Sequence, residues 1–299
     1  MKLSFFIVFV TAFGFSQTDA TITSGNSKLY YKTFGFGKPL LIINGGPGMN
    51  SEGFAAIAEE ISKFGYQTII YDQRGTGKST LETTNSETVT MDLMVQDMEN
   101  LRKHLKIDKW IILGHSFGGI MASYYATKHP ETIDKLIFSS SGGVNMKFTF
   151  YVSNRLQNNL TKIQRDSLSF YQRKMDAGNN SIGILKKRAS FLANAYVFDK
   201  SNASIIAARL TQTKFEINAL VFEDLRKIDF DCTNKFKNFN KPVLVLQGKN
   251  DIITTETAQE IANAFPNSKL VLMDNCGHYG WLDAKEVYLK AIKSFLNNN

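Results

Sequence analysis

The chain has 299 residues and a formal net charge of +8, and 43% of its residues are hydrophobic, so it is neither disordered nor too short to form a full core. The positive excess lies between residues 144 and 240, which contain 16 Lys and Arg against 8 Asp and Glu. Because these charges are scattered without interleaved aromatic residues, they favour a solvated helical surface over a nucleic-acid interface.

The first 20 residues are typical of a secretory signal peptide. Lys2 precedes the apolar run 3–15, and Gly14 and Ser16 are small enough for a signal peptidase site. The run is shorter than the roughly 20 residues that span a bilayer. We therefore expect an exported protein, periplasmic or secreted, without stable membrane insertion; an N-terminal core strand is the alternative.

Short apolar runs then recur along the chain, with helix-compatible stretches between them. They comprise residues 40–43, 68–71, 110–113, 136–138, 243–246 and 270–272. Runs that are apolar throughout are typical of parallel strands covered by helices on both faces. Residues 28–34 alternate less cleanly, which favours an antiparallel edge hairpin. The pattern predicts an α/β fold with a mostly parallel, doubly wound sheet.

This alternation stops after Gly143 and resumes at Lys241. Helix-like stretches near 149–177, 182–197 and 202–222 fill the interval, without a convincing strand. We therefore predict a helical cap at 144–240, inserted between core segments 21–143 and 241–299. Its position in the chain places it over the carboxyl ends of the strands.

Residues 114–118 read Gly-His-Ser-Phe-Gly, directly after the apolar run 110–113. This is the pattern of a nucleophile elbow, in which a serine lies in a strained strand-to-helix turn and its neighbours two positions away must be small. We predict that Ser116 is a nucleophile. The amide of Phe117, at the start of the following helix, is the first candidate donor to an oxyanion.

A serine nucleophile requires a base, and the chain contains only four histidines. His104 lies in a basic amphipathic helix, and His129 ends a helix before a proline. The side chain of His115 should point away from the serine hydroxyl. His278 follows the apolar strand 269–273 through a loop containing Gly277, which places it at the carboxyl edge of the sheet. We therefore predict that His278 is the base.

The base needs an acid to orient it, and Asp251 follows the strand 243–247 at the same edge of the sheet. Asp274 and Asp283 are alternatives, but Asp274 is too close to the histidine along the loop and Asp283 falls in the final helix. With Asp251 the chain order is Ser, Asp, His, the order found in α/β-hydrolases.

The loop after the strand 40–43 reads Asn-Gly-Gly-Pro-Gly and could supply a second oxyanion donor. Glycines let the backbone approach a substrate closely. We predict the amide of Gly46, or less favourably that of Gly45, for this role.

The sequence predicts no cofactor and no metal site. Residues 75–80 read Gly-Thr-Gly-Lys-Ser-Thr, but the first glycine that a phosphate-binding loop requires is replaced by Asp72. Cys232 and Cys276 lack partners for a metal site, and whether they form a disulfide is left open.

The loop 44–48, the segment 71–79 (Tyr-Asp-Gln-Arg-Gly-Thr-Gly-Lys-Ser) and the elbow occur in an order that resembles proline iminopeptidases and their close α/β-hydrolase relatives. The resemblance covers about residues 25–143 and 241–299. It implies an α/β-hydrolase fold with a helical cap, a Ser-Asp-His triad without metal, and release of N-terminal proline from short peptides. It also implies that Asp72 and Arg74 hold their loop in place.

Two departures from the family concern the substrate. Asn44 occupies a position where the family usually has histidine, and Lys249 fills a turn where some relatives have an acid. The family recognises the substrate amine with acidic side chains, for which Glu216, Glu223 and Asp224 are the candidates here. The predicted substrate is thus a short peptide or another small molecule. A carboxylic ester hydrolase and a non-catalytic binding protein are the alternatives, and the sequence does not predict an oligomeric state.

Overall fold

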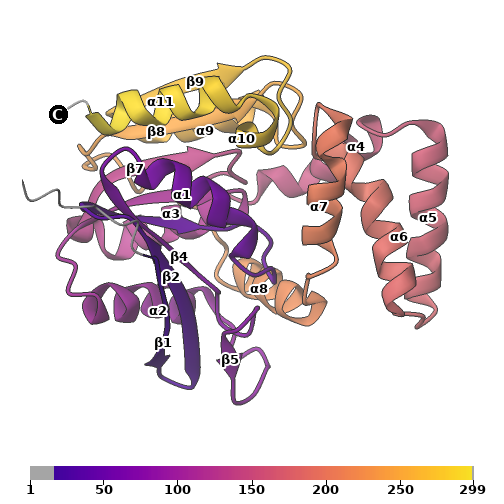
Figure 1. The fold of residues 1–299 in the computed structure, drawn as a ribbon, viewed down its shortest axis with the longest axis horizontal. Helices are drawn as coiled ribbons and strands as arrows, with labels where there is room; N and C mark the ends of the chain where they lie inside the picture. Colours follow the sequence, from indigo (N-terminus) through magenta and orange to yellow (C-terminus); the bar gives the residue numbers. More distant parts are fainter. Residues whose placement is uncertain (1–16, 298–299) are drawn as a thin grey trace, which may run out of the picture.

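The computed structural model describes residues 17–297, which form one nine-stranded sheet with helices on both faces (Figure 1). The strands follow one another in space in the order β1-β2-β4-β3-β6-β7-β8-β9, and β5 pairs with β2. Their bounds are β1 (Gln17–Ser24), β2 (Ser27–Phe34), β3 (Lys38–Ile43), β4 (Tyr66–Tyr71), β5 (Thr80–Leu81), β6 (Trp110–His115), β7 (Ile133–Ser139), β8 (Val243–Gly248) and β9 (Ser268–Met273).

The sheet is parallel from β4 to β9 and antiparallel where β2 pairs with β1, β4 and β5. This confirms the mostly parallel sheet and the antiparallel hairpin around residues 28–34. Each apolar run lies within a strand. Because the strands are parallel, their carboxyl ends meet at one edge, where the loops that follow β3, β6, β8 and β9 come together.

Helices of the core connect the parallel strands, and further helices lie between β7 and β8. The core helices are α1 (Ala55–Ser62), α2 (Met91–His104), α3 (Phe117–Lys128), α9 (Thr255–Ala264), α10 (Gly280–Asp283) and α11 (Lys285–Asn297). The inserted helices are α4 (Val152–Asn158), α5 (Lys162–Asp176), α6 (Ile182–Leu192), α7 (Ala203–Leu210) and α8 (Phe215–Lys227).

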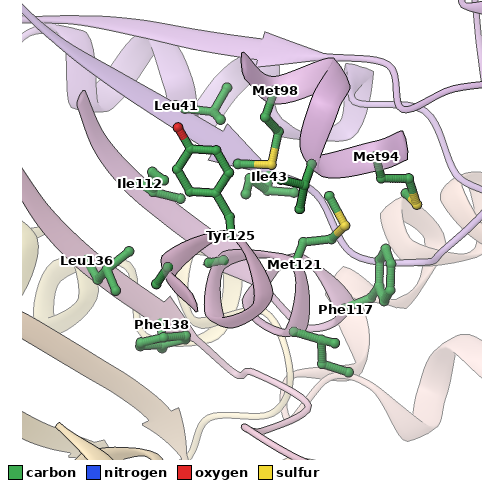
Figure 2. Packing of buried hydrophobic residues seen from close by; sticks show 14 of the residues in the cluster. Leu41, Ile43, Met94, Met98, Ile112, Phe117, Met121, Tyr125, Leu136 and Phe138 are labelled. Atoms are coloured by element: carbon green, nitrogen blue, oxygen red, sulfur yellow. The ribbon is translucent and has the colours of Figure 1, made fainter. Parts of the chain in front are cut away.

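Alternate residues of each central strand point to opposite faces and fill two separate layers of the core. Leu41 and Ile43 of β3 pack with Met98 of α2 and Met121 of α3 on one face (Figure 2). Leu40, next to Leu41 in the chain, is buried on the other face against α1 and α11. Burial on both faces explains why these strands are apolar throughout.

The helices α4 to α7 extend to one side of the sheet as a cap (Figure 1). The helix expected near 149–177 is two helices, because Thr161 begins α5 with a reciprocal capping box to Gln164. α8 packs mainly against the sheet domain rather than with the cap helices. Its residues Ile217, Val221 and Leu225 belong to the same buried cluster as α2, so this part of 144–240 packs on the sheet domain.

Residues 1–16 of the expected signal peptide lie outside the described residues. Gln17–Ala20 form the first half of β1 and pair with Tyr31–Phe34 of β2, so the sheet domain begins four residues before the expected boundary at 21. Within residues 17–297, no helix has the length and apolar character needed to cross a bilayer.

Candidate active site

Ser116 lies in a strained turn between β6 and α3. Its backbone has φ 55° and ψ −119°, a left-handed conformation that is costly for a residue with a side chain. A Cβ atom on Gly114 would lie 2.3 Å from the carbonyl oxygen of Gly118, and one on Gly118 would lie 2.1 Å from that of Ile43. Only glycine fits at either position, as the elbow pattern requires.

The loop after β3 lies directly against this turn. A Cβ atom on Gly45 would lie 2.7 Å from the Cβ of Ser116. The amide group of Asn44 donates to the carbonyl oxygens of Gly45 and Met49, at 2.9 and 3.0 Å. These two hydrogen bonds of Asn44 hold the loop in place, at a position where proline iminopeptidases usually have histidine.

The predicted oxyanion donors Phe117, Gly46 and Gly45 have backbone N–H groups without a hydrogen-bond partner in residues 17–297. Phe117 is the first residue of α3, so its amide has no partner within the helix. Among the hydrogen bonds found in residues 17–297, none uses the amide of Gly45 or Gly46. The turn and the loop therefore present unpaired amides next to Ser116, an arrangement suited to a developing negative charge.

His278 and Asp251 are joined by a hydrogen bond of 2.8 Å between Nδ1 and Oδ1. Asp251 is fully buried, and its carboxylate also accepts from Nε2 of Gln247 at 2.8 Å and from the amide of Ile253 at 3.0 Å. Because Nδ1 is bonded to the carboxylate, the other ring nitrogen, Nε2, remains for proton transfer.

The ring of His278 lies next to the elbow. Its centre is 4.7 Å from the ring centre of His115, the residue that precedes Ser116. In the described residues, the hydroxyl of Ser116 has no hydrogen bond to the imidazole. Such contacts are often long in unliganded hydrolases and shorten when substrate binds.

The two alternative acids have other partners. Asp274 forms a surface ion pair with Lys249 at 2.7 Å. Asp283 accepts from the amides of Gly277 and Phe198, at 2.9 and 2.7 Å, and so holds the loop that carries the histidine. Of the three acids considered, only Asp251 contacts the His278 ring.

His115 is buried behind the candidate base. Its ring packs against Phe54, His278 and Trp281, with centroid separations of 5.3, 4.7 and 4.9 Å. Burial holds the pKa of His115 well below its ordinary value, and the nearby His278 and Arg209 act in the same direction. His115 is therefore neutral and supports the imidazole of His278 from the side.

The cap contacts both loops that carry the acid and the base. The carbonyl oxygen of Tyr196 accepts from the amide of His278 at 2.7 Å. Arg155 donates from Nη2 to the carbonyl oxygen of Asp251 at 2.7 Å, and Asn159 donates to that of Asn250 at 3.2 Å. Sequence reasoning missed these residues, since nothing in their local pattern marks them.

A further missed residue is Gln247, which fixes the acid. It is the last residue but one of the strand β8 and the only polar side chain in it, and a polar side chain near the carboxyl end of a buried strand is a signal that could have identified it.

The acidic residues predicted to bind an amine are not placed for that role. Asp224 is buried, and its carboxylate accepts from the amide of Met91 at 2.7 Å, at the start of α2. Glu216 and Glu223 are exposed on α8 and have no hydrogen bond or ion pair within the described residues. Because the apolar side of α8 faces the core, both glutamates project into solvent. The structure therefore gives no support to an amine pocket built from them.

The segment 71–79 has a structural role. Asp72 accepts from the amides of Ser51 and Lys78, at 2.7 and 2.8 Å. Arg74 forms two hydrogen bonds to Asp97, at 2.8 and 2.7 Å, and both side chains are buried. These contacts hold the loops that follow β3 and β4.

Both cysteines are free thiols rather than a disulfide. Burial raises the pKa of Cys232 and of Cys276 to about 12, so neither is a thiolate at neutral pH. In residues 17–297, no three His, Cys, Asp or Glu side chains gather in a way that could hold a metal ion.

A family model described as the alpha/beta hydrolase fold matches residues 38–285, most of the chain. The protein belongs to the α/β-hydrolase family. The proline iminopeptidase of Lactobacillus helveticus is 27% identical over 274 residues, which cover 87% of this chain and 90% of the relative. The proline iminopeptidase of Saccharolobus solfataricus is 28% identical over 290 residues, which cover 90% of this chain and 89% of that one.

Solved structures of other α/β-hydrolases share the fold at lower identity. A hydrolase from Bacillus anthracis superposes with a TM-score of 0.75 and 20% identity, over 94% of this chain and all of that one. An esterase from Exiguobacterium antarcticum superposes with a TM-score of 0.73 and 18% identity, over 94% of this chain and all of that one. The protein is thus an enzyme of the α/β-hydrolase family that resembles proline iminopeptidases in sequence over most of its length, and the solved structures that share its fold include an esterase.

Proposed function

We propose that this α/β-hydrolase is a serine hydrolase with Ser116, His278 and Asp251 as its catalytic triad. His278 takes the proton of the Ser116 hydroxyl through Nε2 while the serine oxygen attacks a carbonyl carbon. The amides of Phe117 and Gly46 bind the oxyanion. His278 then protonates the leaving group, which leaves an acyl-enzyme on Ser116 that water hydrolyses in the same way.

The hydrogen bond between His278 and Asp251, beside a strained serine, is the observation that carries this proposal. A serine held at φ 55° costs on the order of 1–3 kcal/mol, which a simple binding protein has no reason to retain. Replacing Ser116 with Ala should lower kcat by about 10⁴- to 10⁶-fold and leave the folded state intact. Turnover at the wild-type level would refute the assignment.

Within this class we propose an aminopeptidase that releases N-terminal proline from short peptides. Support comes from the relatives named proline iminopeptidase, each covered over most of its length, and from the three motifs that occur in the family's order. The peptide or another small molecule would be the only partner required, without a cofactor.

A carboxylic ester hydrolase is the second candidate, and the exposed positions of Glu216 and Glu223 favour it. A prolyl amide, the same amide acylated on the proline nitrogen, and a short acyl ester would separate the two. A peptidase that recognises the free amine should lose activity on the acylated amide, whereas an esterase should prefer the ester by a large factor.

We also propose that the protein is exported after removal of an N-terminal signal peptide. The small residues Gly14 and Ser16 precede β1, which begins at Gln17. Cleavage just before β1 would leave every described strand intact. Cell fractionation followed by N-terminal sequencing tests this: a mature protein that begins near residue 17 in the exported fraction supports it, and a cytoplasmic protein with Met1 overturns it.

A further inference from the structure

A cavity of about 460 Å³ lies within the cap, between α4, α5 and α6. Its volume is that of a small-molecule site. Three leucines supply the apolar part of its wall. The polar part consists of two serines and two glutamines together with Arg173, Arg188 and Tyr196, and no Asp or Glu lines it.

None of Ser116, Asp251 and His278 lines this cavity, but two of the segments that bound it contact the loops that carry Asp251 and His278. The ring centres of Tyr196 and His278 are 5.5 Å apart, and the carbonyl oxygen of Tyr196 accepts from the amide of His278. Leu156 of α4 follows Arg155, which donates to the carbonyl oxygen of Asp251. The guanidinium of Arg188 lies 5.9 Å from the ring centre of Phe215.

Phe215 in turn begins α8 next to Lys214, whose amide donates to the carbonyl oxygen of Gly48 at 2.9 Å. The cavity is therefore bounded by segments that contact the loops of the acid and the base, and it is connected to the loop of the predicted oxyanion donor only through Phe215 and Lys214.

Arg188 is held in one orientation and still has unused donors. Its Nε donates to Oε1 of Gln172 at 2.5 Å, and Nε2 of Gln172 donates to Asp176 at 2.9 Å. Its two Nη groups have no hydrogen-bond partner in residues 17–297. Arg173, one position along α5 from Gln172, also lines the cavity and is likewise without an ion pair in that range.

Charge in the surroundings favours an anion. The whole net charge of +8 is carried by residues 144–240. Burial lowers the pKa of Arg188, while Tyr196 and Asp176 act in the opposite direction, so the charged guanidinium is partly desolvated. A desolvated guanidinium with free N–H groups in a cavity is the arrangement that pairs with a carboxylate through two parallel hydrogen bonds.

We infer that this cavity holds the part of the substrate that lies beyond the reacting carbonyl group, and that Arg188, assisted by Arg173, binds a carboxylate group of the substrate there. This rests on the proposed function, because it takes the loops around Ser116 as the site of chemistry. The carboxylate can belong to the leaving group, as in a dipeptide with a free C-terminus, or to the acyl half, as in a monoester of a dicarboxylic acid.

Two matched substrate pairs distinguish these sources. Prolylglycine and prolylglycinamide differ only in a leaving-group carboxylate. Mono-4-nitrophenyl glutarate and its methyl ester differ only in an acyl carboxylate. In one of the two pairs, kcat/KM of the wild-type enzyme should be at least about tenfold higher for the substrate that carries the carboxylate, as expected of a charge-assisted hydrogen bond.

Arg188→Gln should remove this preference, mainly by raising KM for the substrate with the carboxylate. For the neutral substrate of the same pair, kcat/KM should change less than about threefold. Arg226→Gln removes the same charge from an exposed position on α8 and should leave both pairs unchanged. Arg188→Lys should recover part of the preference.

A binding measurement separates this inference from the catalytic proposal. Prolylglycine and glutarate are titrated by calorimetry into the Ser116→Ala protein, with and without Arg188→Gln. Binding that weakens at least about tenfold without the arginine supports the inference, even if no substrate is hydrolysed. Equal binding in both proteins, or no binding of either carboxylate, overturns it. A melting curve of each variant confirms that it is folded.

Discussion

The carbonyl oxygen of Tyr196 accepts a hydrogen bond of 2.7 Å from the amide of His278. Tyr196 belongs to the segment that links α6 to α7, so the cap holds the backbone of the candidate base directly. A Cβ atom on Gly277 would lie 2.6 Å from the same carbonyl oxygen. The two segments are therefore in close contact, and the cap both covers the site and positions one of its residues.

The contact between Gly45 and Ser116 predicts a steric effect on catalysis. In Gly45→Ala the new methyl group would lie 2.7 Å from Cβ of Ser116, and the loop would move away from the elbow. We expect kcat to fall by about 10² to 10³, the effect of losing one oxyanion donor. Steady-state kinetics measure it.

Gly183→Ala is the matched control, because Gly183 lies in α6 with no atom within 4 Å of the added methyl group. It should keep full activity and raise the free energy of unfolding by about 0.5–1 kcal/mol. Equal activity of the two variants would contradict the placement of the loop.

Asp251→Asn should lower kcat by about 10⁴ while the fold is retained. An asparagine can still accept from the amide of Ile253, but its amide group cannot stabilise the imidazolium of His278 and favours the wrong ring tautomer. The pH dependence of kcat/KM measures the effect. A fall of less than tenfold would show that another group orients the base.

The buried pair of Arg74 and Asp97 predicts a stability effect without a catalytic one. Both side chains are 1% exposed. Asp97→Asn leaves the guanidinium of Arg74 without its charged partner, which should reduce the free energy of unfolding by about 3–5 kcal/mol. Urea denaturation measures it. An unchanged midpoint would mean that the carbonyl groups of Thr88 and Leu93 are sufficient partners.

Much of this arrangement can be predicted from the sequence, because it depends on local pattern. The runs around Leu41 and Ile112 are apolar at every position because alternate residues are buried in the two core clusters on opposite faces of the sheet. The glycines around Ser116 are required by contacts within the turn and with the adjoining strand. Asp251 and His278 follow strands that are neighbours in a parallel sheet, so they reach the same edge.

The cap could not be predicted in this way. Arg155 and Tyr196 contact residues of the active-site loops that lie 96 and 82 positions further along the chain, and no local pattern encodes such contacts. The direction of Glu216 depends on which side of α8 packs on the core. Asp224, a residue of the same helix, faces inward because its carboxylate caps α2.

His115 predicts how stability varies with pH. Its pKa in the folded protein lies well below the ordinary value of about 6.5, so between the two pKa values the unfolded chain binds the proton and the folded protein does not. The stabilisation is present above about pH 6.5 and is lost as the pH falls. Between pH 7.5 and 5.5 the wild type should lose more stability than His115→Gln, by at most about 1.4 kcal/mol, the limit for one group whose unfolded pKa is near 6.5. Urea denaturation at both pH values tests this, and parallel losses would show that His115 is protonated in the folded state.

Covalent labelling of the serine tests the central claim most directly. The purified protein is treated with a fluorophosphonate, and the modified peptide is identified by mass spectrometry. The triad predicts one adduct, on Ser116, which is absent from Ser116→Ala and forms far more slowly in Asp251→Asn. An unlabelled wild-type protein, or an adduct that persists in Ser116→Ala, would contradict the proposed serine chemistry.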